Sequence, residues 1–542
     1  MTIRTAILPA MRHTGFPRLA VLTLVLAAGG ARSVPVGAQA ARFDVLVVGG
    51  TVVDGTGAAR HRADVGVRAG RVVEVGVLDG ATATQVVDAT GLIVAPGFID
   101  VHTHADELAD HPLAEHFARM GVTTVIARNC GSSPVDLGAA FTRIKTTGAA
   151  VNFASFVGHN SVREAVMGTA RRAPTAAELA KMKALVAAAM ADGAVGFSTG
   201  LQYVPGTYAA TDEIVALAKV AARSGGVYAS HMRNEGTELE AAVAETLAIG
   251  EQAHMAVQVS HLKVDAPSRW GASAKALAMI DQARARGMRV MADQYLYDAA
   301  SSNLGIRFPS WALEGGQPEI NKRLDDAATW ARIKEEMRKL IRERGIENYS
   351  FARIANYPAD TSLNGLTIPD VAQKLKGSKD LDAQLETMRT MLGAGGASMV
   401  YQFMAEDDIT RILKHPMVSI ASDSGLNTLG SGVPHPRGYG NAVRALGRYV
   451  REMQVITLEE AVRKMTSLPA SQFGFADRGT IAPGKAADLV IFDAATVTDR
   501  ATYDKPHQYP DGVAYVLVNG VAVVAKGAQA EARPGQIVTS SR

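Results

Sequence analysis

The residues Pro96-Gly97-Phe98-Ile99-Asp100-Val101-His102-Thr103-His104 form a short apolar run that ends in two histidines. Side chains two residues apart in an extended segment lie on the same side, so both imidazoles can reach one metal ion. A His-x-His pair alone is a weak signal, because such histidines are often structural. At the end of a buried strand, however, the pair favours metal binding.

Seven more apolar runs follow, separated by segments of helical periodicity such as 178–191, 238–253 and 272–285. Strands that alternate with helices are typical of a parallel sheet built from βα units. Eight such units predict an α/β fold, and specifically a TIM-like (β/α)8 barrel. The expected strands are 97–101, 123–128, 152–157, 195–198, 227–230, 257–260, 289–292 and 417–421.

Two further parts of the chain do not belong to the repeated units. The long gap between the seventh and eighth runs has its own helix candidates at 328–344 and 381–392, which predict an inserted subdomain over about 303–404 above the barrel mouth. Short β runs near both chain ends predict one small β-sandwich domain made from 41–95 and 471–542. The barrel is then expected within 96–470.

The composition excludes several classes of protein. With 542 residues, 47% hydrophobic and 20% charged, the chain can bury a large core and is neither a small stapled module nor a disordered chain. The formal charge of +3 comes from four arginines in residues 1–40, which contain no acidic residue, and the rest of the chain has a charge of −1. We therefore expect no binding of nucleic acid.

Residues 1–40 have the pattern of an export signal peptide. A basic start precedes the apolar run 19–28, and small residues end in Ala38-Gln39-Ala40. The apolar run is too short for a permanent membrane helix, and no later stretch is long and apolar enough. We expect cleavage near Ala40 and a periplasmic or secreted protein without a membrane span.

Potential metal ligands end five of the expected strands. In a barrel of this kind, functional side chains lie at the carboxyl ends of the strands. Imidazole, thiolate and carboxylate groups are the donors that bind zinc. The candidate metal-binding residues are His102, His104, Cys130, His231, His261 and Asp423.

Each of these residues also has a purely structural interpretation. Cys130 is the only cysteine and could be an inert core residue, and either His231 or His261 alone could be a hydrogen-bonded core histidine. Their convergence on one barrel mouth favours metal binding instead. Asp423 could cap a turn, but a carboxylate beside a metal can take a proton from water and pass it to a leaving nitrogen, so it is the expected catalytic residue.

At these positions the sequence resembles the amidohydrolase superfamily, and within it the N-acyl-D-amino-acid deacylases, or D-aminoacylases. Many superfamily members carry a carboxylated lysine at the end of strand four, where this chain has Ser198-Thr199-Gly200. The deacylase branch uses a cysteine on strand two, and Asn129-Cys130-Gly131 looks like that motif. The resemblance implies a tight zinc site formed by Cys130, His231 and His261, and a weaker second site, which need not be filled, formed by His102, His104 and Asp423.

The resemblance also implies a set of substrate contacts. Arginine, lysine and tyrosine side chains can hold a free α-carboxylate. Two details depart from the family pattern, because Ser424 follows Asp423 where glycine is usual, and Ser132-Ser133 stands where an aromatic residue is expected. The implied contacts are Tyr203, Lys263, Tyr295, Ser301 and Arg437.

The implied reaction is zinc-dependent hydrolysis of the amide bond of an N-acyl-D-amino acid, which releases a carboxylic acid and a free D-amino acid. In it Asp423 serves as the general base. The preference for the D form rests on the resemblance alone. Another exported amidohydrolase, acting on dipeptides, cyclic amides or carboxylate-bearing aryl amides, is the alternative. A non-catalytic barrel used for binding is a further alternative, which the presence of all six metal donors disfavours.

Overall fold

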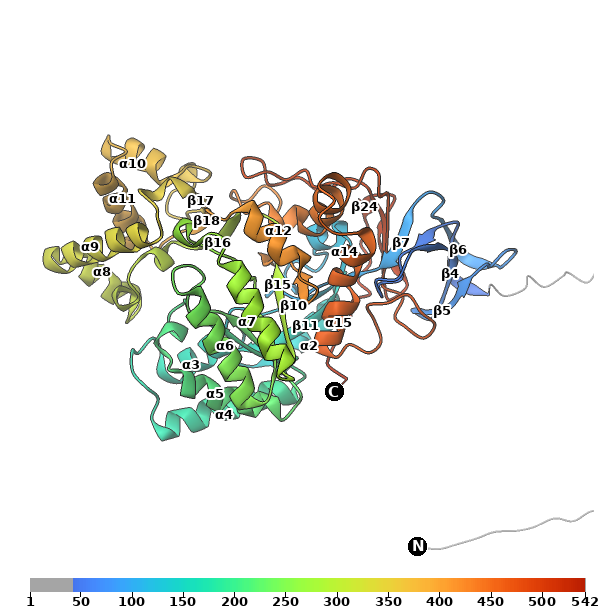
Figure 1. Cartoon of the computed structure of the whole chain (residues 1–542), viewed down its shortest axis with the longest axis horizontal. Coiled ribbons are helices and arrows are strands. Elements are labelled where there is room, and N and C mark those ends of the chain that lie inside the picture. Colours follow the sequence, from blue (N-terminus) through green and yellow to red (C-terminus); the bar gives the residue numbers. More distant parts are fainter. Residues whose placement is uncertain (1–41, 542) are drawn as a thin grey trace, which may run out of the picture. The chain divides into compact units, whose positions relative to one another are not determined.

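The computed structural model describes residues 42–541, and its centre is a barrel of eight parallel strands (Figure 1). Neighbours in this sheet follow one another in chain order, as repeated βα units require. The predicted α/β barrel is therefore confirmed. Its strands are β8 (Phe98–Asp100), β10 (Val122–Ala127), β11 (Asn152–Gly158), β12 (Gly196–Gly200), β13 (Val227–His231), β14 (Ala256–Val259), β15 (Val290–Gln294) and β19 (Val418–Ile420).

The barrel closes between its last and first strands through a short extension at the carboxyl ends. There β9 (Thr103–His104) pairs in parallel with β20 (Ser424–Gly425). The backbone N–H of Asp423 also donates a hydrogen bond to the carbonyl of His102 at 2.8 Å. Closure of the barrel thus brings two parts of the chain more than three hundred residues apart to one seam.

Helices α3 to α7 contact one another in chain order around the sheet, and α7 also contacts α12. Local sequence sets their ends: Thr175 and Glu178 form a reciprocal capping box, so α4 begins two residues before the expected position. The helices of the barrel region are α1 (Glu115–Arg119), α2 (Leu137–Thr147), α3 (His159–Met167), α4 (Ala176–Ala191), α5 (Thr211–Ala222), α6 (Leu239–Ala253), α7 (Ser273–Ala285), α12 (Glu406–Lys414), α13 (Arg437–Arg444), α14 (Leu458–Met465) and α15 (Ser467–Phe473).

The expected insertion between β15 and β19 has its own hydrophobic core, which includes Trp330, Met337, Tyr349 and Met388. Besides the two expected helices it contains two more helices and a three-stranded antiparallel sheet, which the sequence did not reveal. Figure 1 shows the three strands lying together beside these helices. The elements are β16 (Ala299–Asn303), β17 (Ala352–Asn356), β18 (Ser398–Gln402), α8 (Gln317–Asp325), α9 (Ala327–Glu343), α10 (Ile368–Lys376) and α11 (Leu381–Gly393).

Both ends of the described chain form the β-sandwich, as expected. In its larger sheet β21 from the C-terminal part pairs antiparallel with β7 from the N-terminal part. The two sheets share one core, which includes Val45, Val65 and Leu489. The smaller sheet contains β1 (Phe43–Val48), β4 (Asp64–Arg68), β5 (Arg71–Gly76) and β6 (Ala83–Asp88), and the larger contains β2 (Thr51–Val52), β3 (His61–Arg62), β7 (Ile93–Pro96), β21 (Leu489–Phe492), β22 (Val513–Val518), β23 (Val521–Ala525) and β24 (Ala528–Gln529).

The expected signal peptide, residues 1–40, lies outside the described residues. Within 42–541, no helix combines the length and the apolar character needed to span a bilayer.

Candidate metal centre

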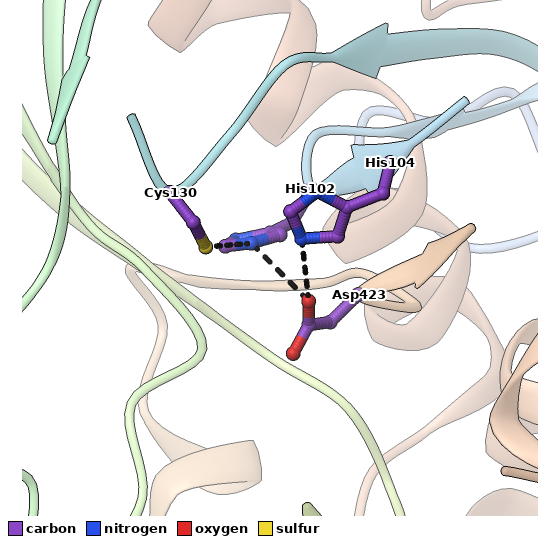
Figure 2. Close-up of side chains that lie close together, drawn as sticks. All are labelled: His102, His104, Cys130 and Asp423. Atoms are coloured by element: carbon purple, nitrogen blue, oxygen red, sulfur yellow. Dashed lines mark hydrogen bonds and ion pairs between the residues drawn. The ribbon is translucent and has the colours of Figure 1, made fainter. Parts of the chain in front are cut away.

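The carboxyl ends of the barrel strands bring the six predicted metal-binding side chains together. These side chains form two overlapping groups, and within each group all donor atoms lie within 4.8 Å of one another. The first contains His102, His104, Cys130 and Asp423 (Figure 2), and the second contains Cys130, His231 and His261. Cys130 therefore belongs to both groups, whereas the resemblance assigned it to one site only.

The first group lies on the barrel seam. The Asp423 Oδ1 atom is 3.4 Å from Nε2 of His102 and 3.3 Å from Nε2 of His104. The Cys130 sulfur lies 3.4 Å from the same Nε2 of His102. Both histidines thus turn the same ring nitrogen toward the carboxylate, as two ligands of one cation would.

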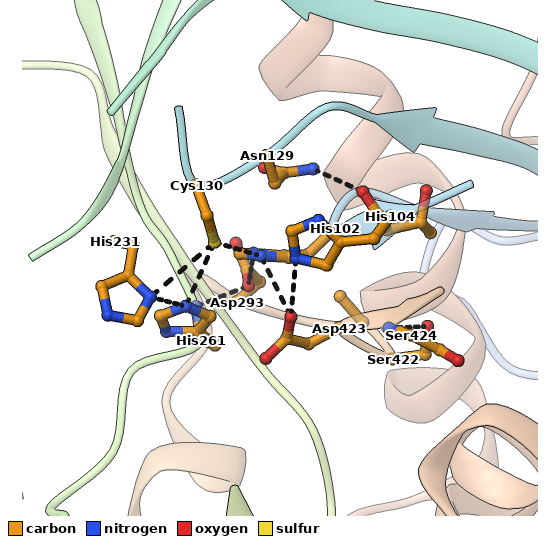
Figure 3. Close-up of polar contacts among 12 residues, drawn as sticks. His102, His104, Asn129, Cys130, His231, His261, Asp293, Ser422, Asp423 and Ser424 are labelled. Carbon is orange, nitrogen blue, oxygen red and sulfur yellow. Dashed lines mark hydrogen bonds and ion pairs between the residues drawn. The ribbon is translucent and has the colours of Figure 1, made fainter. Parts of the chain in front are cut away.

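The second group gathers around the same sulfur (Figure 3). Cys130 Sγ lies 3.7 Å from Nδ1 of His231 and 3.6 Å from Nε2 of His261, and these two nitrogens are 2.8 Å apart. All three side chains are at most 8% exposed. A thiolate and two imidazoles converging on one point fit zinc, which takes sulfur and nitrogen ligands in a tetrahedral arrangement.

Three of the six residues have a backbone conformation that residues other than glycine rarely adopt. The φ angle is +56° at Cys130, +34° at His261 and +53° at Asp423. Such a conformation costs about 1–3 kcal/mol at each position and persists where the surrounding fold enforces it, most often at functional sites. All three residues lie in the loops that follow their barrel strands, and their donor atoms lie in the cluster.

A ring of acceptors fixes the orientation of the histidines. Asp293 lies 3.0 Å from Nδ1 of His102, the Glu235 carboxylate lies 2.9 Å from Nδ1 of His261, and the Gln202 oxygen lies 2.9 Å from Nε2 of His231. In each ring the opposite nitrogen faces the cluster. Such partners set the tautomer and the basicity of metal-binding histidines.

Sequence reasoning missed these three acceptors. Asp293 could have been found, because it lies near the end of the seventh barrel strand, where polar residues are expected to be functional. Gln202 and Glu235 lie in loops, and nothing in their local sequence distinguishes them.

The electrostatics of the cluster favour anionic donors. Burial raises the pKa of the Cys130 thiol, but the adjacent His102 imidazole and hydrogen bonds from the neighbouring histidines lower this pKa well below its usual value. Burial likewise raises the pKa of Asp423, and Arg437 and His102 lower it by more, so that it also lies well below its usual value. Thiolate and ionised carboxylate are the forms that ligate a metal.

A pocket of about 420 Å³ opens over the cluster, and all five predicted substrate contacts line it. Arg437 Nη1 forms an ion pair with Asp423 Oδ2 at 2.9 Å, and the guanidinium lies 4.4 Å from the centre of the Tyr295 ring. Lys263 donates to Glu235 at 2.7 Å. Arg437, Lys263 and Tyr295 therefore form a basic corner beside Asp423.

The other two predicted contacts lie in different parts of the pocket. The hydroxyl of Tyr203 is 3.5 Å from Nδ1 of His231 and accepts a hydrogen bond from Ser302 at 3.1 Å. Ser301 donates to the carbonyl of Met399, within the inserted sheet. Tyr203 is thus near the second group of ligands, whereas Ser301 is held by the insertion.

One basic residue of the pocket wall was not predicted. Arg307, in the insertion, is only 6% exposed and packs against the rings of Tyr401, Phe351 and Phe403. Its Nε atom has no hydrogen-bond partner within residues 42–541, and the Asp265 carboxylate, which is ion-paired with Arg344, acts on its charge only from a distance. Burial and the charge of Arg344 lower the pKa of Arg307 from its usual value, so the nearby carboxylate does not fully compensate the buried charge.

Residues 85–524 match the amidohydrolase family. Three relatives from Alcaligenes xylosoxydans xylosoxydans align with almost the whole chain. The N-acyl-D-glutamate deacylase is 38% identical, and the alignment covers 92% of this chain and 96% of that relative. The D-aminoacylase is 37% identical, and the alignment covers 89% of this chain and 94% of that relative. The N-acyl-D-aspartate deacylase is 36% identical, and the alignment covers 92% of this chain and 95% of that relative.

Solved structures of deacylases of this kind are also similar to this chain. The N-acyl-D-glutamate deacylase of Bordetella bronchiseptica, complexed with zinc and a phosphonate mimic of the tetrahedral intermediate, has 38% identity and a TM-score of 0.78 over 91% of this chain and 99% of its own. A D-aminoacylase structure has 35% identity and a TM-score of 0.79, and the match covers 92% of this chain and 100% of that one. The chain therefore belongs to the amidohydrolase family, and within it to the N-acyl-D-amino-acid deacylases. The predicted class of enzyme, a metal-dependent amidohydrolase, is confirmed.

Replacement of Cys130 by alanine tests the metal centre. Because this sulfur is shared by both groups of donors, C130A should retain less than about a tenth of the zinc that the wild-type protein keeps through gel filtration. Metal analysis by atomic absorption measures this. His61→Ala, which removes an exposed histidine, should leave the zinc content unchanged. Full zinc content in C130A would rule out the sulfur as a ligand.

Proposed function

We propose that this chain is a zinc-dependent deacylase of N-acyl-D-amino acids, releasing a carboxylic acid and a free D-amino acid. The observation that carries the proposal is the position of Cys130 between two sets of imidazole ligands, beside a carboxylate paired with Arg437. Three relatives that align with nearly the whole chain are named for deacylation of D-amino acids, which supports the D preference.

The donors present fit zinc. In this proposal Cys130, His231 and His261 form the tight site, and His102, His104 and Asp423 form a weaker second site with the shared sulfur nearby. When bound, zinc supplies Lewis acidity, which polarises an acyl carbonyl and lowers the pKa of water. The buried thiolate favours retention of the metal.

Asp423 moves the proton. Its low pKa keeps the carboxylate ionised at neutral pH, and its Oδ2 atom is held by Arg437 at 2.9 Å while Oδ1 faces the cluster. It takes a proton from the attacking water and then donates that proton to the nitrogen of the departing amino acid. Both transfers occur on one side of the scissile bond, because one carboxylate serves both.

The basic corner binds the free carboxylate of the substrate. Arg437 and Lys263 provide positive charge, and the hydroxyl of Tyr295 has no partner within the described residues and is free to donate. These groups place the amino-acid half of the substrate on the side of Asp423, where its nitrogen can receive the proton.

Arg307 favours a substrate with an acidic side chain. This arginine lines the same pocket and is buried, and Asp265, the carboxylate that acts on its charge, is already ion-paired with Arg344. A side-chain carboxylate of bound D-glutamate or D-aspartate would pair with it and offset the cost of its burial. The named relatives include deacylases of both amino acids.

Removal of the proposed general base should leave most of the zinc bound and abolish most of the deacylase activity. In Asp423→Asn, the tight site is intact, so zinc content should be at least half that of wild type, while kcat falls about 10²- to 10⁴-fold. Parallel metal analysis and a deacylation assay with N-acetyl-D-glutamate test this. Asp407→Asn, which changes an exposed residue of α12, is the control. Undiminished turnover in D423N would exclude the proposed role.

The side-chain preference is tested by Arg307→Leu and Arg307→Lys. Loss of a charge-assisted hydrogen bond should lower kcat/KM for N-acetyl-D-glutamate at least about tenfold in R307L, with little change for N-acetyl-D-methionine. R307K should keep part of the preference. Arg332→Leu removes an exposed arginine of the insertion and should behave as wild type. An equal effect on both substrates would contradict the assignment.

We further propose that the chain is exported and loses residues 1–40. The support is the basic, apolar and small-residue pattern of that segment. N-terminal sequencing of the protein from the extracellular or periplasmic fraction should give a chain that begins near Ala41. An intact chain confined to the cytosolic fraction would contradict export.

A further inference from the structure

A second cavity, of about 470 Å³, adjoins the pocket above the metal cluster. The two share part of their walls, the loop after β12 and the start of the insertion, through Gln202, Tyr203, Val204, Asn303 and Ile306. The second cavity lies between this loop and the insertion. A ligand that fills the first pocket can therefore extend past these residues into the second.

The second cavity differs from the first in charge. Its remaining walls combine the apolar side chains of Phe308, Leu313, Ile320 and Leu392 with three polar ones, Ser310, Asn356 and Ser398. None of the described residues that line it is charged, whereas the first pocket is lined by several charged side chains, among them Lys263, Arg307 and Arg437. The second cavity suits a neutral, apolar part of a ligand, and not the charged amino-acid part.

One wall of this cavity lies across the barrel mouth from Asp423 and Arg437, while its other walls belong to the insertion that follows β15. Asp423 and Arg437 follow β19, the eighth barrel strand, whereas Tyr203 follows β12, the fourth. In a closed barrel of eight strands the fourth and the eighth lie opposite each other. If the substrate carboxylate lies at Arg437, the acyl group points across the barrel mouth toward Tyr203 and the second cavity.

We propose that the second cavity binds the hydrocarbon tail of a medium-chain acyl group, such as octanoyl. This inference rests on the proposed function. Because each methylene group removed from water contributes favourably to binding, kcat/KM should rise at least about tenfold from N-acetyl to N-octanoyl substrates. The rise should appear with both D-glutamate and D-methionine derivatives, since the tail and the side chain occupy different cavities.

The test compares these four substrates in wild-type protein and in two variants of Leu313. This residue is half-buried on the cavity wall and is not among the residues that line the metal pocket. Leu313→Trp fills the cavity and Leu313→Glu places a charge in it. Both should lose most of the preference for octanoyl while hydrolysing the N-acetyl substrates at wild-type rates.

Matched substitutions provide the control. Leu340→Trp and Leu340→Glu change an exposed leucine of α9 that does not line the cavity, and they should keep the octanoyl preference. Thermal unfolding of all four variants identifies any that are misfolded.

The outcomes separate the two proposals. If none of the four substrates is hydrolysed, the proposed function is wrong. If the N-acetyl substrates are hydrolysed but octanoyl gives no gain, or the gain survives in both L313W and L313E, then the acyl tail does not bind in the second cavity. A dependence of kcat/KM on the length of the amino-acid side chain instead would assign the cavity to that side chain and also overturn the inference.

Discussion

The gathering of imidazoles around the single thiolate of Cys130 is the constraint on which the rest of the site depends. Buried thiolate, carboxylate and imidazole groups at 3 to 4 Å are stable only if a cation or protons compensate their charge. The left-handed backbone at Cys130, His261 and Asp423 shows that the fold forces these side chains together at a cost. The acceptors behind the histidines then orient each ring.

The barrel seam ties this chemistry to the architecture. The same short pairing that closes the barrel, β9 with β20, carries His104 and lies next to Asp423. Any loosening of the closure would separate the carboxylate from the histidines. The insertion completes the site from above, since residues 300–307 form one wall of the metal pocket and part of the wall of the second cavity. The stability of the barrel closure and the geometry of the site therefore depend on the same contacts.

Local sequence patterns predicted the barrel and the six donor residues that the structure brings together. Apolar runs mark buried strands, and a polar residue directly after such a run lies at the barrel mouth, as His231 and His261 do. The inserted sheet was missed because β16 reads Ala-Ala-Ser-Ser-Asn and carries no strand signal. Arg307 and Glu235 were missed because only tertiary packing brings them to the site.

Zinc K-edge X-ray absorption of the purified protein shows whether the sulfur of Cys130 is a ligand of the metal. If Cys130 binds the metal, the spectrum should show one sulfur ligand at about 2.3 Å together with nitrogen ligands at about 2.0–2.1 Å. A zinc ion surrounded by nitrogen and oxygen alone would contradict it.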